Sequence, residues 1–172
     1  ISGGSYNISS RDDCIHSNGT ISITGGTLTL SSGNDAFHAN SDLAVSGGTI
    51  TVENSFEGMD ASRVIMSDGA VTVNASDDGI MTVNAFTLTG GTLYIDADGD
   101  GIDSNGTLQV RGGVMVISGP TSDLDSALDC AGSSVINGGV VVALGSAPMA
   151  QGFSNSPSQG TAFCKFKTQA AN

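Results

Sequence analysis

The sequence predicts an all-β fold, a right-handed, three-sided parallel β-helix (β-solenoid) of about seven rungs with ~22 residues in each rung. Three observations support this fold class. The 172 residues include 25 Gly, no Trp and only 5% aromatic side chains, which is typical of many short strands joined by turns. A Gly-containing turn recurs at nearly constant spacing, and apolar residues alternate with polar ones around it. Helical repeats are disfavoured, because Gly is frequent and no segment shows a 3.6-residue period.

The repeated turn is a Gly-Gly pair, replaced by Asp-Gly in one unit. It begins at Gly3, Gly25, Gly47, Asp68, Gly90, Gly112 and Gly138, with intervals of 21 or 22 residues and a last interval of 26. Four complete units span residues 21–42, 43–63, 64–85 and 86–107. Each unit reads as an alternating strand, the Gly turn, a second alternating strand, and a polar turn that contains one apolar residue.

Three columns of apolar residues appear when the units are aligned, because alternate side chains of a strand point to one face. The first strands contribute Ile21, Leu43, Val64, Phe86 and Leu108; the second strands contribute Leu28, Ile50, Val71, Leu93 and Met115; the polar turns contribute Ile15, Phe37, Met59, Ile80, Ile102 and Leu128. A single unit cannot bury its own apolar face, so the units must stack. Connections between parallel strands are nearly always right-handed, which sets the predicted hand of the solenoid.

The sequence predicts two regions. Residues 1–152 form the β-helix, and residues 153–172 form a tail that caps the solenoid or links subunits. A solenoid has open ends with unpaired backbone groups, and no capping helix is evident in the sequence. The apolar segment 162–166, "AFCKF", is a candidate final strand. A head-to-tail homo-oligomer, and so an extracellular fibre, is therefore an alternative to a single-chain binding domain. Because the chain begins at Ile1 without Met, we expect a mature or trimmed piece.

Charge and cysteine content limit the partners. Seventeen acidic and five basic residues give a net charge of −12, and without a basic patch nucleic acid is excluded as a partner. No run is long and apolar enough for membrane insertion. Three cysteines cannot all pair internally; if a disulfide forms in an oxidising compartment, the favoured pair is Cys130–Cys164.

Acidic residues form two further columns when the units are aligned. The first column holds Asp13, Asp35, Glu57, Asp78 and Asp100, and it fails only in the last, longer unit, where Ser126 stands. The second column, three residues further along each unit, holds His16, His38, Asp60, Met81, Asp103 and Asp129. The inward apolar residue of the turn lies between the two columns. Both columns therefore run along one corner of the predicted solenoid.

Such columns are unfavourable without compensation. Stacked strands lie about 4.8 Å apart, and carboxylates at that distance repel by roughly 1 kcal/mol in water and roughly 3–4 kcal/mol at an effective dielectric near 20. The acids either cap N–H groups of the turns, which is the simpler interpretation for any single Asp, or bind a hard cation between rungs. Calcium fits a set of oxygen ligands better than Mg²⁺ or Zn²⁺. The candidate calcium ligands are Asp13, Asp35, Glu57, Asp60, Asp77, Asp78, Asp98, Asp100, Asp103 and Asp129. His16 and His38 are interpreted as hydrogen-bonding turn residues.

A family resemblance rests on the ordered set of units. The stretches "SGGTITVENSFEGMDAS", "NASDDGIMTVNAFTLTGGTLYIDADGDGIDSNG" and "SGPTSDLDSALDCAG", followed by "GSAPMAQ", resemble secreted bacterial carbohydrate-binding β-helix domains, which are related in fold to family 9 polysaccharide lyases. The resemblance covers residues 1–152. It implies a right-handed parallel β-helix with bound calcium, an extracellular or cell-surface location, and binding of a cellulose-like or acidic plant polysaccharide without demonstrated cleavage. The chain departs from the family pattern at His16, His38 and Met81.

Catalysis is not expected. A β-helix lyase needs a Lys or Arg base beside a calcium-bound uronate. Lys165 and Lys167 lie in the tail, and Arg11 is the single candidate base on a rung. An ordinary salt bridge is the simpler role for Arg11. The expected function is thus calcium-stabilised polysaccharide binding; the fibre subunit is the alternative, and a polysaccharide lyase is less favoured.

Overall fold

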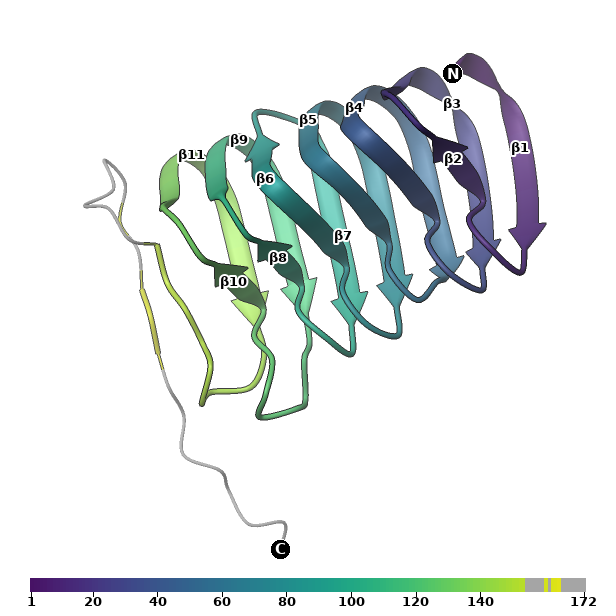
Figure 1. Ribbon diagram of the computed structural model, residues 1–172. Coiled ribbons are helices and arrows are strands. Elements are labelled where there is room, and N and C mark those ends of the chain that lie inside the picture. The colour runs from purple at the N-terminus through teal and green to yellow at the C-terminus, as the bar shows by residue number, and fades with distance from the viewer. Residues whose placement is uncertain (154–159, 161, 165–172) are drawn as a thin grey trace, which may run out of the picture.

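The computed structural model describes residues 1–153, 160 and 162–164. These residues form a parallel β-solenoid of about six turns, with ~22 residues per turn and no helix (Figure 1). Eleven strands follow one another along the chain: β1 (Ser2–Ser10), β2 (Ile15–Ser17), β3 (Ile21–Ser32), β4 (Phe37–Asn54), β5 (Met59–Ala75), β6 (Ile80–Leu88), β7 (Thr92–Ala97), β8 (Ile102–Ser104), β9 (Thr107–Ser118), β10 (Leu128–Cys130) and β11 (Ser134–Leu144).

Every strand pair is parallel, and the register follows the repeat. Leu28 of β3 pairs with Ile50 of β4, and the column continues through Val71, Leu93 and Met115. The columns that begin at Ile21 and at Ile15 are also stacked as predicted. These side chains fill the interior: Phe37, Phe86, Ile102 and Leu108, among others, are fully buried. The all-β prediction and the stacking of the units are therefore confirmed.

The Gly-Gly pairs have a backbone cause. The second glycine of each pair has a positive φ, for example +92° at Gly48 and +100° at Gly69, a region that side chains with a Cβ rarely adopt. The first glycine lies against the preceding turn: a Cβ on Gly47 would lie only 2.7 Å from the carbonyl oxygen of Thr24. The repeated pair therefore lets adjacent turns bend in the same way at the same place.

The number of turns differs slightly from the prediction. The structure has about six turns where about seven rungs were predicted, while the three-sided cross-section and the right hand stay predictions. The extra residues of the last unit lie between β9 and β10. The boundary at residue 152 also stays a prediction.

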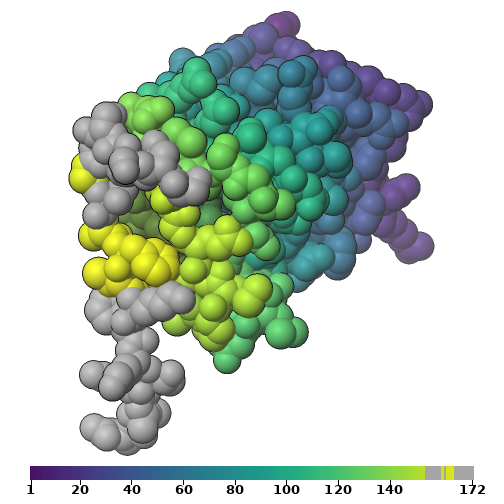
Figure 2. All heavy atoms as spheres, turned by 60° about the vertical axis from the view of Figure 1, so that its left-hand side comes forward, coloured from purple at the N-terminus to yellow at the C-terminus, as the bar shows by residue number. Residues whose placement is uncertain are grey.

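The C-terminal end of the solenoid is drawn toward the viewer in Figure 2. There Phe163 and Cys164 line a cavity of about 820 Å³ together with Leu128, Ile136 and Phe153 of the last turns. Residues 162–164 are not part of a strand, and the rest of the predicted strand "AFCKF" lies outside the described residues. The capping role of the tail stays a prediction.

The three cysteines are free in the structure. Cys130 is buried at the last turn and Cys164 is exposed, so the favoured Cys130–Cys164 bridge does not form. Within the described part of the chain, no helix has the length and hydrophobicity needed to cross a membrane.

Candidate functional site

The two predicted acidic columns are brought together along one corner of the solenoid. The second column is in strand register through His16, His38, Asp60, Met81, Asp103 and Asp129. The first column lies in the turns just before these strands. There the N–H that follows each member donates to the carbonyl of the next, as from Cys14 to Asp35 and from Gly79 to Asp100. The strict repeat thus places carboxylates of successive turns side by side.

Turn capping accounts for part of the first column. One carboxylate oxygen of Asp13 accepts a hydrogen bond from the N–H of Asp35 at 3.2 Å. In the same way Asp78 accepts from Asp100 at 2.8 Å, and Asp100 accepts from Ser126 at 2.5 Å. In each case the acceptor is Oδ1, which leaves Oδ2 for a second role. Capping of a turn N–H group, the simpler role predicted for a single Asp, is therefore confirmed for one carboxylate oxygen of each of these three residues. The other carboxylate oxygen takes no part in this capping.

The first acidic group, called the Glu57 cluster below, consists of Asp35, Glu57 and Asp60. Each contributes one oxygen, and these oxygens all lie within 4.8 Å of one another. Burial and then the negative charges of Asp35, Asp60 and Asp78 raise the pKa of Glu57 to about 8. Burial also raises the pKa of Asp35, whose side chain is only 7% exposed. Folding therefore holds these acids where their ionised forms are unfavourable unless a cation is present.

The second group, the Asp100 cluster, consists of Asp78, Asp100 and Asp103, again with one oxygen each within 4.8 Å of the others. Burial raises the pKa of Asp78 to about 7, although the N–H of Asp100 opposes the shift. Burial raises the pKa of Asp100 to about 6 against the opposing hydrogen bond from Ser126. The pKa of Asp103 is raised by burial and by the charge of Asp129. This cluster contains no histidine.

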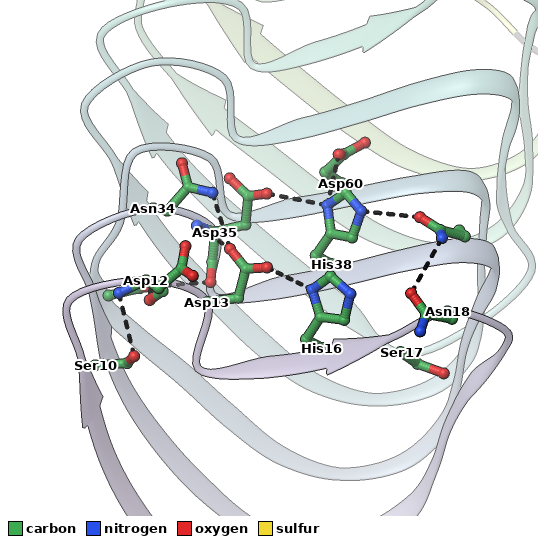
Figure 3. A network of polar contacts seen from close by, with 12 residues as sticks. Ser10, Asp12, Asp13, His16, Ser17, Asn18, Asn34, Asp35, His38 and Asp60 are labelled. Atoms are coloured by element: carbon green, nitrogen blue, oxygen red, sulfur yellow. Dashed lines mark hydrogen bonds and ion pairs between the residues drawn. The ribbon is translucent and has the colours of Figure 1, made fainter.

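Histidines occupy the N-terminal end of the second column (Figure 3). His16 contacts Asp13, with 2.7 Å between Nδ1 and Oδ2. Nδ1 of His38 lies 3.2 Å from Asp35 and 2.9 Å from Asp60. The two imidazole rings stack with their centroids 4.8 Å apart. The interpretation of both histidines as hydrogen-bonding residues is confirmed, but the role of His38 as a link between two turns was missed.

The geometry also groups His38 with Asp13 and Asp35, whose ligand atoms all lie within 4.8 Å of one another. Burial alone would lower the pKa of His38, but its hydrogen bonds to Asn40 and Asp35 and the charge of Asp60 raise it overall. A protonated His38 therefore places an internal positive charge beside the Glu57 cluster. The sequence contained a signal for this contact between His38 and an acid of the next turn. His38 stands in the same column as Asp60 and Asp103, so the aligned units place it directly beside Asp60.

The donor chemistry of the two acidic clusters fits calcium. Oxygens bound to one Ca²⁺ at about 2.3–2.6 Å lie no more than about 5.2 Å apart. The oxygens of each cluster lie within 4.8 Å of one another, inside that limit. All three ligands of each cluster are carboxylates, whereas Zn²⁺ prefers His and Cys and Mg²⁺ keeps several waters in a strict octahedron. Three carboxylates supply only part of a calcium shell of 6–8 oxygens, so carbonyl oxygens or water would complete it.

The other predicted ligands lie apart from these clusters. Asp77 contributes only a neighbouring charge that raises the pKa of Glu57 and Asp78. Asp129 is in register with Asp103, but its carboxylate accepts a hydrogen bond from Gln151. Asp98 lines a separate groove.

This groove has a volume of about 350 Å³ and lies where β3, β4, β5 and β7 end. It is lined by Ser32, Gly33, Asn54, Ser55, Phe56, Asn74, Ala75, Ser76, Asp96, Ala97 and Asp98. Of these residues only Asp98 was a predicted site residue, and the rest were missed. The available signal was that Asn74 and Asp96 occupy the same position in successive units.

Comparison with known proteins identifies the family. A family model for carbohydrate-binding domain-containing proteins matches residues 1–36 and 36–159. The chain belongs to this carbohydrate-binding family. The match spans both acidic clusters and the groove. No curated protein and no solved structure matches the chain.

Proposed function

We propose that this member of the carbohydrate-binding family binds a polysaccharide outside the cell, with calcium ions stabilising adjacent turns, and that it does not cleave its ligand. The observation that supports this most strongly is the family match, which covers nearly the whole solenoid. A polysaccharide also suits the shape, because stacked turns present the same groups repeatedly along one direction (Figure 1).

The calcium part of the proposal rests on the two acidic clusters. Asp78, Asp100 and Asp103 would hold one ion, and Asp35, Glu57 and Asp60 would hold another. Each set joins successive turns, so a bound ion would offset both the burial and the mutual repulsion that raise the pKa values of Glu57 and Asp78. Bound calcium supplies charge neutralisation and a link between turns.

The absence of cleavage is supported by two of the three arginines on the turns, while the predicted salt-bridge role of Arg11, the candidate base, stays a prediction. Arg63 forms two short hydrogen bonds to the carboxylate of Asp42, and Arg111 donates to Gln109. Neither lies in an acidic cluster, where a lyase base would be required. The kinship in fold to family 9 polysaccharide lyases and the head-to-tail assembly stay predictions.

Affinity gel electrophoresis tests the proposed function. The purified protein is run through gels that contain soluble neutral or acidic plant polysaccharides, once with millimolar calcium and once with a chelator. We expect retardation by at least one polysaccharide in calcium, with no new reducing ends formed. Unretarded migration in every gel would contradict carbohydrate binding, and new reducing ends or unsaturated products would contradict the absence of catalysis.

A further inference from the structure

The groove lined by residues 32–33, 54–56, 74–76 and 96–98 shares no residue with either acidic cluster. It is built by four successive turns, which are held together by backbone hydrogen bonds from Phe56 to Asn34, from Ser76 to Ser55 and from Asp98 to Ala75. Its walls therefore belong to the rigid solenoid. Its volume of about 350 Å³ is at the small end of the range for ligand pockets, about 300–1,000 Å³, which suits one sugar ring.

The groove combines an aromatic surface with polar groups that are available to a ligand. Phe56 is 46% exposed and contributes an aromatic side chain to the lining of the groove. Asn74 of β5 and Asp96 of β7 are paired in register, and both side chains point outward. Neither side chain has a hydrogen-bond partner among the described residues. By contrast, the amide of Asn54 is used internally, by Ser31 and by the carbonyl of Ser32.

This combination is suited to sugar recognition. The C–H face of a pyranose packs on an aromatic ring, and a neighbouring amide and carboxylate bind adjacent hydroxyl groups. Adjacent strands lie about 4.8 Å apart, so the side chains of Asn74 and Asp96 can reach two hydroxyls of the same ring. Ser55 and Ser76 add hydroxyl groups to the lining, although both donate to backbone carbonyls within the chain.

Charge selects between neutral and acidic sugars. Asp96 and Asp98 line the groove, and no Lys or Arg is among its lining residues. A uronate in the groove would therefore meet the carboxylates of Asp96 and Asp98, which repel it. A neutral sugar has no such penalty.

We propose that this groove is the sugar-binding subsite and that it takes an uncharged pyranose unit of a polysaccharide, with Phe56 as the stacking surface and Asn74 and Asp96 as the hydroxyl-binding pair. The proposal rests on the proposed carbohydrate-binding function and deepens it by naming the subsite and the ligand class.

The test compares variants by affinity electrophoresis and titration calorimetry, with hydroxyethyl cellulose and xyloglucan as neutral probes and polygalacturonate as the acidic probe, all in millimolar calcium. Phe56→Ala and Asn74→Ala should weaken binding of a neutral probe by about tenfold each. Asp96→Asn should weaken neutral binding and, because it removes a repelling charge, strengthen retention by polygalacturonate.

Two control variants carry the same kinds of substitution at exposed positions outside the groove. Val83→Ala removes an exposed apolar side chain on β6. Asp68→Asn removes an exposed charge and keeps the oxygen that caps Gly69. Both should bind like the unmodified protein. Circular dichroism and the melting temperature establish whether each variant is folded. The three groove substitutions lie on separate elements, so a folding defect in one variant leaves the other two informative.

The outcomes separate the two proposals. If the unmodified protein binds a neutral probe and all folded groove variants bind it equally well, the groove assignment is wrong while carbohydrate binding stands. If polygalacturonate binds more tightly than both neutral probes and Asp96→Asn does not change its binding, the ligand class is wrong. If the unmodified protein binds no polysaccharide, the proposed function itself fails and this subsite with it.

Discussion

Nδ1 of His38 lies 2.9 Å from Oδ2 of Asp60, which belongs to the next turn of the solenoid. The same nitrogen lies 3.2 Å from Oδ2 of Asp35. When protonated, His38 therefore neutralises part of the Glu57 cluster from within the protein. A calcium ion at Asp35, Glu57 and Asp60 would use the same oxygens, so proton and metal are expected to compete there.

Calcium affinity at the Glu57 cluster should consequently rise as pH increases from 6 to 8. Glu57, whose pKa is raised to about 8, loses its proton over this range, and the pKa of His38, which burial lowers, is raised overall by its hydrogen bonds to Asn40 and Asp35, which favours the competing proton at the acidic end. Each proton released on binding contributes up to about tenfold in affinity per pH unit. The His38→Ala variant should bind calcium more tightly at pH 6 and show a shallower pH dependence by titration calorimetry. His16→Ala, which removes the contact with Asp13 outside this cluster, is the control; equal slopes for the unmodified protein and His38→Ala would contradict the competition.

Without metal, stability should fall as pH rises, which is opposite to ordinary acid denaturation. The pKa of Glu57 is raised from 4.5 to about 8, that of Asp78 to about 7 and that of Asp100 to about 6. A group whose pKa is raised by folding stabilises the protein below its unfolded pKa, and this contribution is lost as pH passes through the folded value. The melting temperature in chelator should therefore be higher at pH 5 than at pH 8. Equal or rising values across this range would show that these carboxyl groups do not interact as described.

The pH effect should be much smaller in saturating calcium, because the ion replaces the protons. A ligand present at about 100 times its Kd stabilises a protein by about 2.7 kcal/mol. For a chain of this size that corresponds to a rise of about 5–10 °C in melting temperature. Differential scanning calorimetry with calcium and with a chelator at pH 8 measures this difference, and coinciding transitions would argue against any bound ion.

Asp100→Asn should have opposite effects with and without calcium. The amide oxygen of Asn can still accept the hydrogen bond from the N–H of Ser126, so the turn is preserved. At pH 8 in chelator the variant should melt higher than the unmodified protein, because it lacks a carboxylate that burial and neighbouring acids disfavour. In calcium it should gain less, since a ligand of the Asp100 cluster is missing. Asp68→Asn is the charge-matched control and should shift neither value.

Core packing should control stability independently of metal. Phe86 and Val83 both lie on β6, but Phe86 is fully buried and Val83 is 54% exposed. Phe86→Ala should reduce the free energy of unfolding by about 3–5 kcal/mol, whereas Val83→Ala should change it by less than about 0.5 kcal/mol. Urea denaturation in chelator measures both. Similar losses for the two variants would mean that β6 does not present these faces as described.

The turn geometry predicts a similar contrast between glycines. Gly91 has φ of +79°, and a Cβ there would lie 2.6 Å from the carbonyl oxygen of Gly69. Gly91→Ala should therefore cost at least about 1–2 kcal/mol, because the preceding turn blocks relaxation. Gly3 has no atom within 4 Å of an added Cβ, so Gly3→Ala should be nearly neutral. The two melting temperatures, measured in chelator, check this difference.

The columns could be predicted because the repeat is nearly strict. A constant interval fixes which residue stacks on which, so the register of Phe37 on Met59 and of His38 on Asp60 followed from aligned sequence alone. The direction of each side chain did not follow. Asp77 and Asp78 are adjacent in sequence, yet only Asp78 joins the Asp100 cluster. Asp129 stands in the correct column but is engaged by Gln151, a contact between distant parts of the chain.

The sequence by itself determined the repeating fold, the buried columns and the corner along which acids accumulate, because alternation and period are local properties of the chain. Only the tertiary structure decided which carboxylates converge, which of them cap a turn, and that His38 links two turns. It also revealed the groove of Phe56, Asn74 and Asp96, whose members come from different turns. The physical reason is that burial, electrostatic interaction and a shared cavity depend on distances across turns, and side-chain conformation sets those distances after the backbone has stacked.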